Sequence, residues 1–130
     1  MRIGLIGFGK AGKAVANVIL QNPEFNLEWV LRKSKNMENI SVKELLETDS
    51  TDKAQIFSEQ NIEISEHFRK YPVDAIIDFS SSESIHKYGK AASEKKIKII
   101  SAISHYGDDE IKVLKELSKS ILFFGHPILL

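Results

Sequence analysis

Apolar positions along this 130-residue chain switch between two periods, and each switch predicts a change between strand and helix. Short apolar runs predict β-strands at residues 2–6, 26–31, 73–79, 96–101 and 121–124. Helical spacing between these runs predicts α-helices at residues 10–21, from 80–82 to 94, and from 108 or 109 onward. The buried face of the first helix is expected to contain Ala14, Val15, Val18 and Ile19.

The segment between residues 36 and 71 has a weaker pattern. Ser41 and Glu44 have the spacing of a capping box, which predicts a short helix through Glu47. Residues 65–70 predict one or two further helical turns. No strand is predicted in this segment.

Strands that alternate with helices predict right-handed βαβ units. The nearly continuous apolar run at 73–79 is typical of a strand buried on both faces of a parallel sheet. We therefore expect an α/β fold of the Rossmann type, a parallel sheet with helices on both faces, in a single domain over residues 1–130. Such folds bind ligands outside the carboxyl ends of their strands, which here are residues 7–12, 32–35, 79–82, 101–105 and 125–127.

The loop after the first predicted strand reads Gly7-Phe8-Gly9-Lys10-Ala11-Gly12, the G-x-G-x-x-G pattern of a dinucleotide-binding unit. Gly7 permits a tight turn, Gly9 lets the backbone approach a pyrophosphate, and Gly12 allows close contact of helix and strand. The unpaired amides and the positive dipole end of the helix would hold the phosphates. Lys10 either pairs with the pyrophosphate or faces the solvent.

The residue at the end of the second predicted strand bears on the choice between NAD and NADP. An acidic residue roughly 20 positions beyond the glycine loop commonly binds the ribose 2′-hydroxyl of NAD. This chain has Arg32 there, which cannot accept a hydrogen bond but matches the oxygens of a 2′-phosphate. Lys33 and Ser34 provide further donors. We expect a preference for NADP(H), with an exposed basic turn as the alternative interpretation.

Composition narrows the class of partner. Eighteen basic residues balance 18 acidic ones, so the chain lacks the excess of positive charge that binding to nucleic acid or to an anionic membrane requires. Cysteine is absent and the four histidines lie far apart in sequence, so no local metal-ligand motif is present. Glycines and lysines interrupt the N-terminal apolar run, which excludes a secretory signal and a membrane span there. We expect a cytoplasmic protein.

The glycine loop, the basic second-strand end and the sequence Val73-Asp74-Ala75-Ile76-Ile77-Asp78-Phe79-Ser80 resemble the N-terminal domain of dihydrodipicolinate reductase over nearly the whole chain. Members of that family reduce the cyclic imine precursor of tetrahydrodipicolinate with NADPH or NADH, on the route to diaminopimelate and lysine. The resemblance implies that the nicotinamide half of the cofactor lies near Phe79, Ser80 and Ser81. It also allows the backbone of Ser101, Ala102 and Ile103 to contact the carboxamide of the nicotinamide.

The chain also departs from that family. It has Ser101-Ala102-Ile103-Ser104 where members often have Gly-Thr-Thr-Gly, so the contacts of those threonine side chains are not carried over. Its glycine loop is one residue shorter than in many members. The His-His-x-x-Lys and Pro-Ser-Gly-Thr motifs of the substrate domain are absent, so no catalytic residue is assigned. We expect a truncated two-domain reductase that lacks its C-terminal substrate domain and binds NADPH without turnover.

Several residues carry more than one interpretation. His105 and His126 follow predicted strands at the ligand edge, where each either contacts cofactor or substrate or is a loop residue. Trp29 and Tyr88 are expected in the core. The apolar segment 123–130 would allow chains to associate into a homo-oligomer.

Two other functions remain open at this stage. A regulatory module could use the same glycine loop to sense a dinucleotide, but such modules commonly keep an acid in place of Arg32 and lack the sequence Asp78-Phe79-Ser80. The cofactor domain of another amino-acid dehydrogenase, such as a diaminopimelate or diaminopentanoate dehydrogenase, fits the glycine loop about as well. Fold alone does not separate these substrates.

Overall fold

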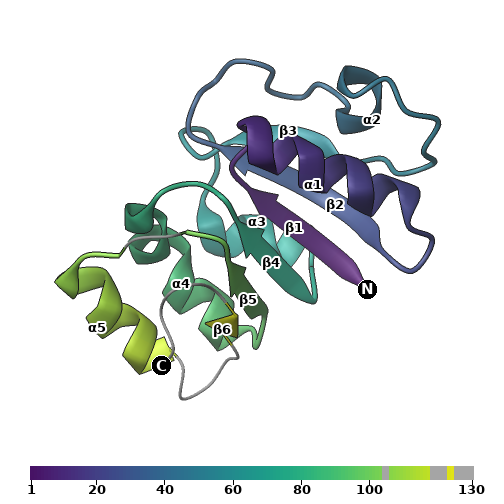
Figure 1. Cartoon of the computed structure of the whole chain (residues 1–130). Helices are drawn as coiled ribbons and strands as arrows, with labels where there is room; N and C mark the ends of the chain where they lie inside the picture. Colours follow the sequence, from purple (N-terminus) through teal and green to yellow (C-terminus); the bar gives the residue numbers. More distant parts are fainter. Residues whose placement is uncertain (104–105, 118–122, 125–130) are drawn as a thin grey trace.

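A parallel β-sheet forms the centre of the molecule (Figure 1). The computed structural model describes residues 1–103, 106–117 and 123–124. Its strands are β1 (Arg2–Ile6), β2 (Asn26–Arg32), β3 (Gln55–Ser58), β4 (Ala75–Asp78), β5 (Lys98–Ser101) and β6 (Phe123–Phe124). Over these residues the strand order is β3-β2-β1-β4-β5-β6, and every neighbouring pair of strands is parallel. The predicted Rossmann-type fold is confirmed.

The winding of the sheet reverses at β1. The chain moves outward from β1 to β2 and β3, then returns to β4 on the opposite side of β1. Ile6 at the end of β1 is therefore in register with Leu31 of β2 and with Asp78 of β4. Open α/β sheets bind ligands outside the carboxyl ends of the strands at such a reversal.

Helices cover both faces of the sheet, as Figure 1 shows. Two of them, α1 (Lys10–Gln21) and α2 (Val42–Leu45), contribute to one core cluster, which joins Ala16, Ile19 and Val42 to Leu5, Val30 and Ile56. The opposite cluster receives α3 (Ile64–Lys70), α4 (Ile85–Glu94) and α5 (Asp108–Leu117), and includes Phe68, Tyr88, Leu114, Trp29 and Ile76. The predicted core positions of Trp29 and Tyr88 are thus confirmed. No helix in the described part of the chain is long and apolar enough to cross a membrane.

The buried face of α1 differs from the predicted one. Ala14 is exposed and Val18 is 65% exposed, whereas the buried residues are Gly12, Ala16, Ile19 and Leu20. Gly12 sets this orientation, because a Cβ atom on it would lie 2.6 Å from the carbonyl oxygen of Gly7. The residues at helical spacing from Gly12 face the sheet with it. The prediction was therefore wrong for Ala14 and Val18.

The strand β3 is absent from the sequence-based prediction. Ala54, Ile56 and Ser58 are buried and alternate with more exposed residues, as in a β-strand. The alternation covers too few residues to predict a strand from the sequence. The outer edge of β3 is covered by residues 39–42. Asn39 N donates a hydrogen bond to Ile56 O (2.7 Å), and Ile56 N donates to Ile40 O (3.1 Å).

The capping box predicted at Ser41 does not form. Ser41 is the N-cap of α2, but its side chain makes no cap hydrogen bond, and the helix ends at Leu45 instead of Glu47. Glu47 has a φ of 54°, outside the helical region. Ser41 instead forms an isolated antiparallel bridge with Gln55 of β3. Pairing with a distant strand thus replaces the local cap.

The helix α3 places His67 in an aromatic cluster. The centroid of its ring lies 4.8 Å from that of Trp29 and 4.9 Å from that of Phe57, and the residue is 4% exposed. Burial, and to a smaller extent the charge of Lys70, lowers the pKa of His67 to about 4. The ring is therefore neutral in the folded protein at pH 7.

Gly4→Ala should destabilise the fold, because a Cβ atom at this position would lie 2.3 Å from the ring of Trp29. That ring is fully buried, and its Nε1 donates to Tyr71 O (3.0 Å). Overpacking of this kind costs about 1–3 kcal/mol, so the free energy of unfolding in urea should fall by that amount. Gly9→Ala is the matched control, because nothing lies within 4 Å of a Cβ atom there. Equal stability of the two variants would contradict the prediction.

Stability should also depend on pH through His67. A histidine in the unfolded chain takes up its proton near pH 6.5, but the buried ring does so only near pH 4. The unfolded state therefore binds more protons between these values, and the free energy of unfolding should fall as the pH is lowered from 6.5 to 4. His67→Phe should lose this part of the slope in urea unfolding. The same slope in His67→Phe as in the parent chain would refute this origin.

Candidate cofactor site

Two close backbone contacts shape the glycine loop between β1 and α1. Gly7 has a φ of 98°, and a Cβ atom on it would lie 2.9 Å from Phe79 C and from Ser80 N. Gly12 packs in turn against the carbonyl of Gly7. A Cβ atom on Gly9, by contrast, would meet no atom within 4 Å. The backbone at Gly9 is thus open to a ligand, while the other two glycines are needed for close packing.

The N-terminus of α1 begins at this open position. Gly9 is the N-cap and has no side chain to cap the helix, and the first turn contains no acidic residue. The first amides of a helix carry partial positive charge, so an anion fits here. Lys10 and Ala11 are exposed beside it. The side chain of Phe8 is only 4% exposed and packs in the core on the α1 side, so this predicted site residue can face a ligand only with its backbone.

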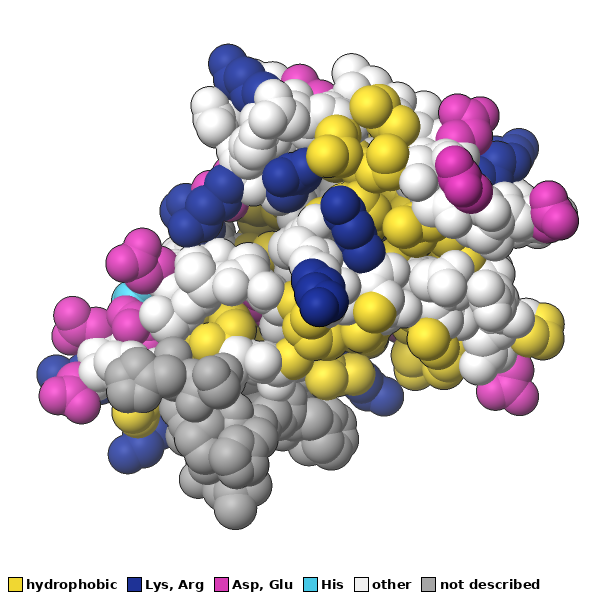
Figure 2. Space-filling model, turned by 45° about the horizontal axis from the view of Figure 1, so that its top comes forward, with side chains coloured by type: hydrophobic (Ala, Val, Ile, Leu, Met, Phe, Trp, Pro, Cys, Tyr) yellow, Lys and Arg dark blue, Asp and Glu magenta, His cyan; other side chains and the backbone are white. Residues whose placement is uncertain are grey.

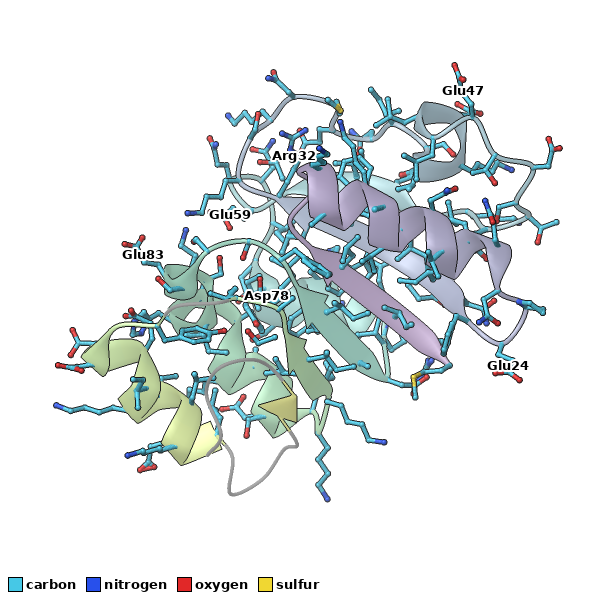
Figure 3. All side chains as sticks on the ribbon, in the orientation of Figure 1. Glu24, Arg32, Glu47, Glu59, Asp78 and Glu83 are labelled. Carbon is cyan, nitrogen blue, oxygen red and sulfur yellow. The ribbon has the colours of Figure 1, made fainter. Side chains whose placement is uncertain are left out.

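The predicted site residues Arg32, Lys33 and Ser34, at the end of β2 and just after it, differ in their hydrogen-bond partners. Arg32, at the end of β2, has a buried Nη1 with no hydrogen-bond partner in the described structure, and Figure 3 shows this residue beside the start of α1. Lys33 Nζ donates to Ser81 Oγ (3.2 Å), and Ser34 Oγ accepts from Asn36 N (3.0 Å). Of these three side chains, Arg32 therefore has a buried donor left for a ligand.

The distribution of charge around α1 also favours an anion. Figure 2 brings this side of the molecule forward, and lysine and arginine side chains lie in the middle of the view. Most aspartate and glutamate side chains in the same view lie toward its margins. The chain as a whole has equal numbers of basic and acidic residues, so this is a local arrangement.

The serines after β4 form a turn with internal hydrogen bonds. Ser80 Oγ donates to Asp78 Oδ1 (2.5 Å) and lies 2.7 Å from Ser84 Oγ. Neither Ser81 nor Ser84 makes a side-chain cap hydrogen bond to the 3₁₀ turn η1 (Ser82–Ser84) or to α4. Ser80 is thus held by the protein itself.

The end of β5 lies beside this turn. Ser101 is in register with Asp78 of β4, and Ala102 N donates to Asp78 O (2.9 Å). The hydroxyl of Ser101 is buried and hydrogen-bonds to Tyr106 Oη, whereas Ala102 is exposed and Ile103 is half-buried. The structure therefore brings residues 101–103 next to the serine turn. His105, His126 and residues 125–130 of the apolar segment predicted to associate lie outside the described residues.

Asp78, the fully buried acid at the end of β4, is not among the predicted site residues. Its Oδ1 accepts from Ser80 N (2.8 Å), and its Oδ2 accepts from Tyr88 Oη (2.6 Å). Burial raises the pKa of Asp78, and these hydrogen bonds oppose the rise. An acid at the end of an apolar strand is the sequence signal for such a carboxylate, because charged groups are rarely buried without a reason.

The arrangement fits a ligand with phosphates at two points. One point is the N-terminus of α1, where Gly9 leaves open space and no side chain caps the helix. The other is the unpartnered Nη1 of Arg32, one strand away. A dinucleotide with a pyrophosphate and a further phosphate on its ribose has groups for both points.

Comparison with known sequences identifies one family. The model described as dihydrodipicolinate reductase, N-terminus, matches residues 1–127. The 4-hydroxy-tetrahydrodipicolinate reductase of Caldanaerobacter subterraneus subsp. tengcongensis is 31% identical over 116 residues, which are 89% of this chain and 38% of that protein. The chain therefore spans well under half the length of this relative.

Solved structures share the fold at low identity. A probable dehydrogenase from Thermotoga maritima has a TM-score of 0.72 and 18% identity, covering 97% of this chain and 36% of that one. Dipicolinate-bound dihydrodipicolinate reductase from Paenisporosarcina sp. TG-14 has a TM-score of 0.71 and 12% identity, covering 98% and 47%. Scyllo-inositol dehydrogenase from Lactobacillus casei with bound NAD(H) has a TM-score of 0.67 and 14% identity, covering 97% and 36%. At these identities the likeness is one of fold.

Gly9→Ala should leave the fold intact but weaken binding of a pyridine dinucleotide. Its Cβ atom meets nothing in the protein, yet it would occupy the space in which a phosphate approaches the helix amides. We expect the dissociation constant for NADPH, measured by calorimetry, to rise about tenfold or more. Ala14→Ser, on the exposed side of the same helix, is the control. Unchanged affinity in Gly9→Ala would remove the phosphates from this position.

Proposed function

The chain belongs to the family of dihydrodipicolinate reductase N-terminal domains, and we propose that it is the NADPH-binding domain of a reductase of that family. The observation that carries the choice of NADPH is the buried, unpartnered Nη1 of Arg32. The glycine loop and the uncapped N-terminus of α1 support binding of the pyrophosphate.

Arg32 favours a cofactor with a 2′-phosphate for a geometric reason. The strand β2 lies directly beside β1, and its last residue is where NAD-binding domains commonly place an acid for the 2′-hydroxyl. A guanidinium has donors only, and its planar fork fits the oxygens of a phosphate. Lys33, which reaches Ser81 in this structure, and Ser34 could supply further donors from the same loop.

We place this domain in a reductase that transfers a hydride to a cyclic imine on the route to diaminopimelate and lysine. The 31% identity to a 4-hydroxy-tetrahydrodipicolinate reductase supports that substrate class. When bound, the cofactor supplies the hydride, and the residues of this chain bind and orient it. The His-His-x-x-Lys and Pro-Ser-Gly-Thr motifs of the family's substrate domain do not occur in this sequence, so we assign substrate contacts and the proton donor to a separate substrate domain.

A second candidate is the cofactor domain of a different dehydrogenase. Inositol dehydrogenases share the fold at TM-scores similar to that of dihydrodipicolinate reductase, so fold does not choose between the substrates. The regulatory-module hypothesis is weaker, because such modules commonly have an acid where this chain has Arg32.

Arg32→Asp should reverse the cofactor preference. Charge-assisted hydrogen bonds contribute about 1.5–3 kcal/mol each, so loss of one contact to the 2′-phosphate should weaken NADPH binding about tenfold or more. NADH lacks this phosphate, and its affinity should stay the same or improve. Calorimetric titration of both nucleotides gives the ratio of the two affinities.

Lys35→Asp is the matched control, because it makes the same charge change on an exposed residue of the same loop. It should lower NADPH affinity only slightly and leave the ratio of affinities near that of the parent chain. An unchanged ratio in Arg32→Asp would exclude Arg32 from the site. Absence of binding by either nucleotide to the parent chain would overturn the proposed function itself.

A further inference from the structure

Asp78 is a buried carboxylate at the reversal point of the sheet. It is 0% exposed, and it is in register with Ile6 on one side and with Ser101 on the other. Ile6 is the last residue of β1 before the glycine loop. Figure 3 shows Asp78 in the interior of the molecule, at the end of β4. A burial this complete is costly for a carboxylate and calls for a local reason.

Both oxygens of this carboxylate accept hydrogen bonds from uncharged groups. Oδ1 accepts from Ser80 N (2.8 Å) and from Ser80 Oγ (2.5 Å), and Oδ2 accepts from Tyr88 Oη (2.6 Å). The bond from the amide two residues later closes a local turn of the Asx type. The backbone after β4 is therefore fixed by a side chain from within the strand, and the Ser80 hydroxyl is used in the same contact.

The peptide held by this turn is the one that meets the glycine loop. Phe79 N donates to Ile6 O (2.8 Å), and the Phe79–Ser80 peptide lies 2.9 Å from where a Cβ atom of Gly7 would be. The amide groups of Phe79 and Ser80 are thus both occupied inside the protein. What the turn presents to a ligand is its shape and the residue that follows, Ser81.

The position of this turn identifies the half of the dinucleotide that it would face. The pyrophosphate sits at the N-terminus of α1, and the ribose with the 2′-phosphate lies toward the end of β2. Since β2 and β4 lie on opposite sides of β1, the nicotinamide half extends toward the end of β4. This step rests on the proposed function.

We propose that Asp78 is a positioning residue for the nicotinamide half of the cofactor and that it acts through Ser80. The carboxylate does not touch the cofactor. It holds the Phe79–Ser80 peptide against the glycine loop, so that the wall beside the nicotinamide keeps one shape. Ser80, a predicted cofactor contact, then contributes through the turn.

The test compares a whole dinucleotide with its adenosine half. Adenosine 2′,5′-bisphosphate carries the 2′-phosphate and one phosphate of the pyrophosphate but lacks the nicotinamide. In calorimetric titrations of the 130-residue chain, Asp78→Ala, which removes the acceptor of both Ser80 hydrogen bonds, and Ser80→Ala should each weaken NADPH binding about tenfold, the effect of one lost hydrogen-bonded contact. Their affinities for the bisphosphate should stay within about twofold of the parent value. A merely structural role would weaken both ligands together.

Two further variants separate positioning from stability. Tyr88→Phe leaves Asp78 Oδ2 without its buried donor but keeps the contacts to Ser80, so it should lower the unfolding midpoint and leave both affinities unchanged. The double variant of Asp78 and Ser80 should bind NADPH no more weakly than the Asp78 variant alone, because the Ser80 hydroxyl acts through its hydrogen bond to Asp78.

Equal losses for the two ligands in Asp78→Ala, or no loss for NADPH, would overturn the inference and leave the proposed function standing. If Asp78→Ala does not fold, Ser80→Ala decides, since it keeps the carboxylate and its bond to Tyr88. A parent chain that binds neither ligand would instead overturn the proposed function. The two failures are therefore distinguishable.

Discussion

The close approach of three backbone segments at the end of β1 is the constraint on which the rest of the structure depends. Gly7 lies against the Phe79–Ser80 peptide, and the start of α1 lies against Gly7 through Gly12. A side chain at either glycine would separate these segments, because the distances to a Cβ atom are 2.6–2.9 Å. This contact sets the rotation of α1 about its axis and brings the start of that helix over the reversal point of the sheet, where a ligand can reach both.

The parts of the fold that follow from local patterns could be predicted from the sequence. The apolar run that contains β4 is almost uninterrupted because both of its faces are covered, and such a run is readable without knowing its neighbours. The orientation of α1 could not be predicted in the same way, since Val18 and Ala16 are both apolar and only the contact of Gly12 chooses between them. The strand β3 is held mainly by pairing with β2 and with residues 39–42, so its own sequence shows little.

The candidate site also has one part that follows from local sequence and another that depends on contacts made only in the folded chain. The glycine loop and Arg32 could be picked out because their spacing and residue types reflect steric and charge requirements that are local. Phe8 lies inside the same motif, yet its side chain packs in the core. The contacts of Lys33 with Ser81, and of Asp78 with Tyr88, join residues that only the folded chain brings together. The spacing of residues along the sequence does not reveal such pairs, so Asp78 was not predicted as a site residue.

The cover on the outer edge of β3 has a consequence for how this sheet can meet other molecules. Residues 39–42 occupy the amide and carbonyl of Ile56 and the carbonyl of Ala54, which an edge strand would otherwise offer to a passing extended segment. Strand addition, in which a foreign peptide or a second sheet continues the ladder, is blocked at this end. A protein that associates with this side of the molecule must therefore recognise side chains and surface shape, because the main-chain template is already filled.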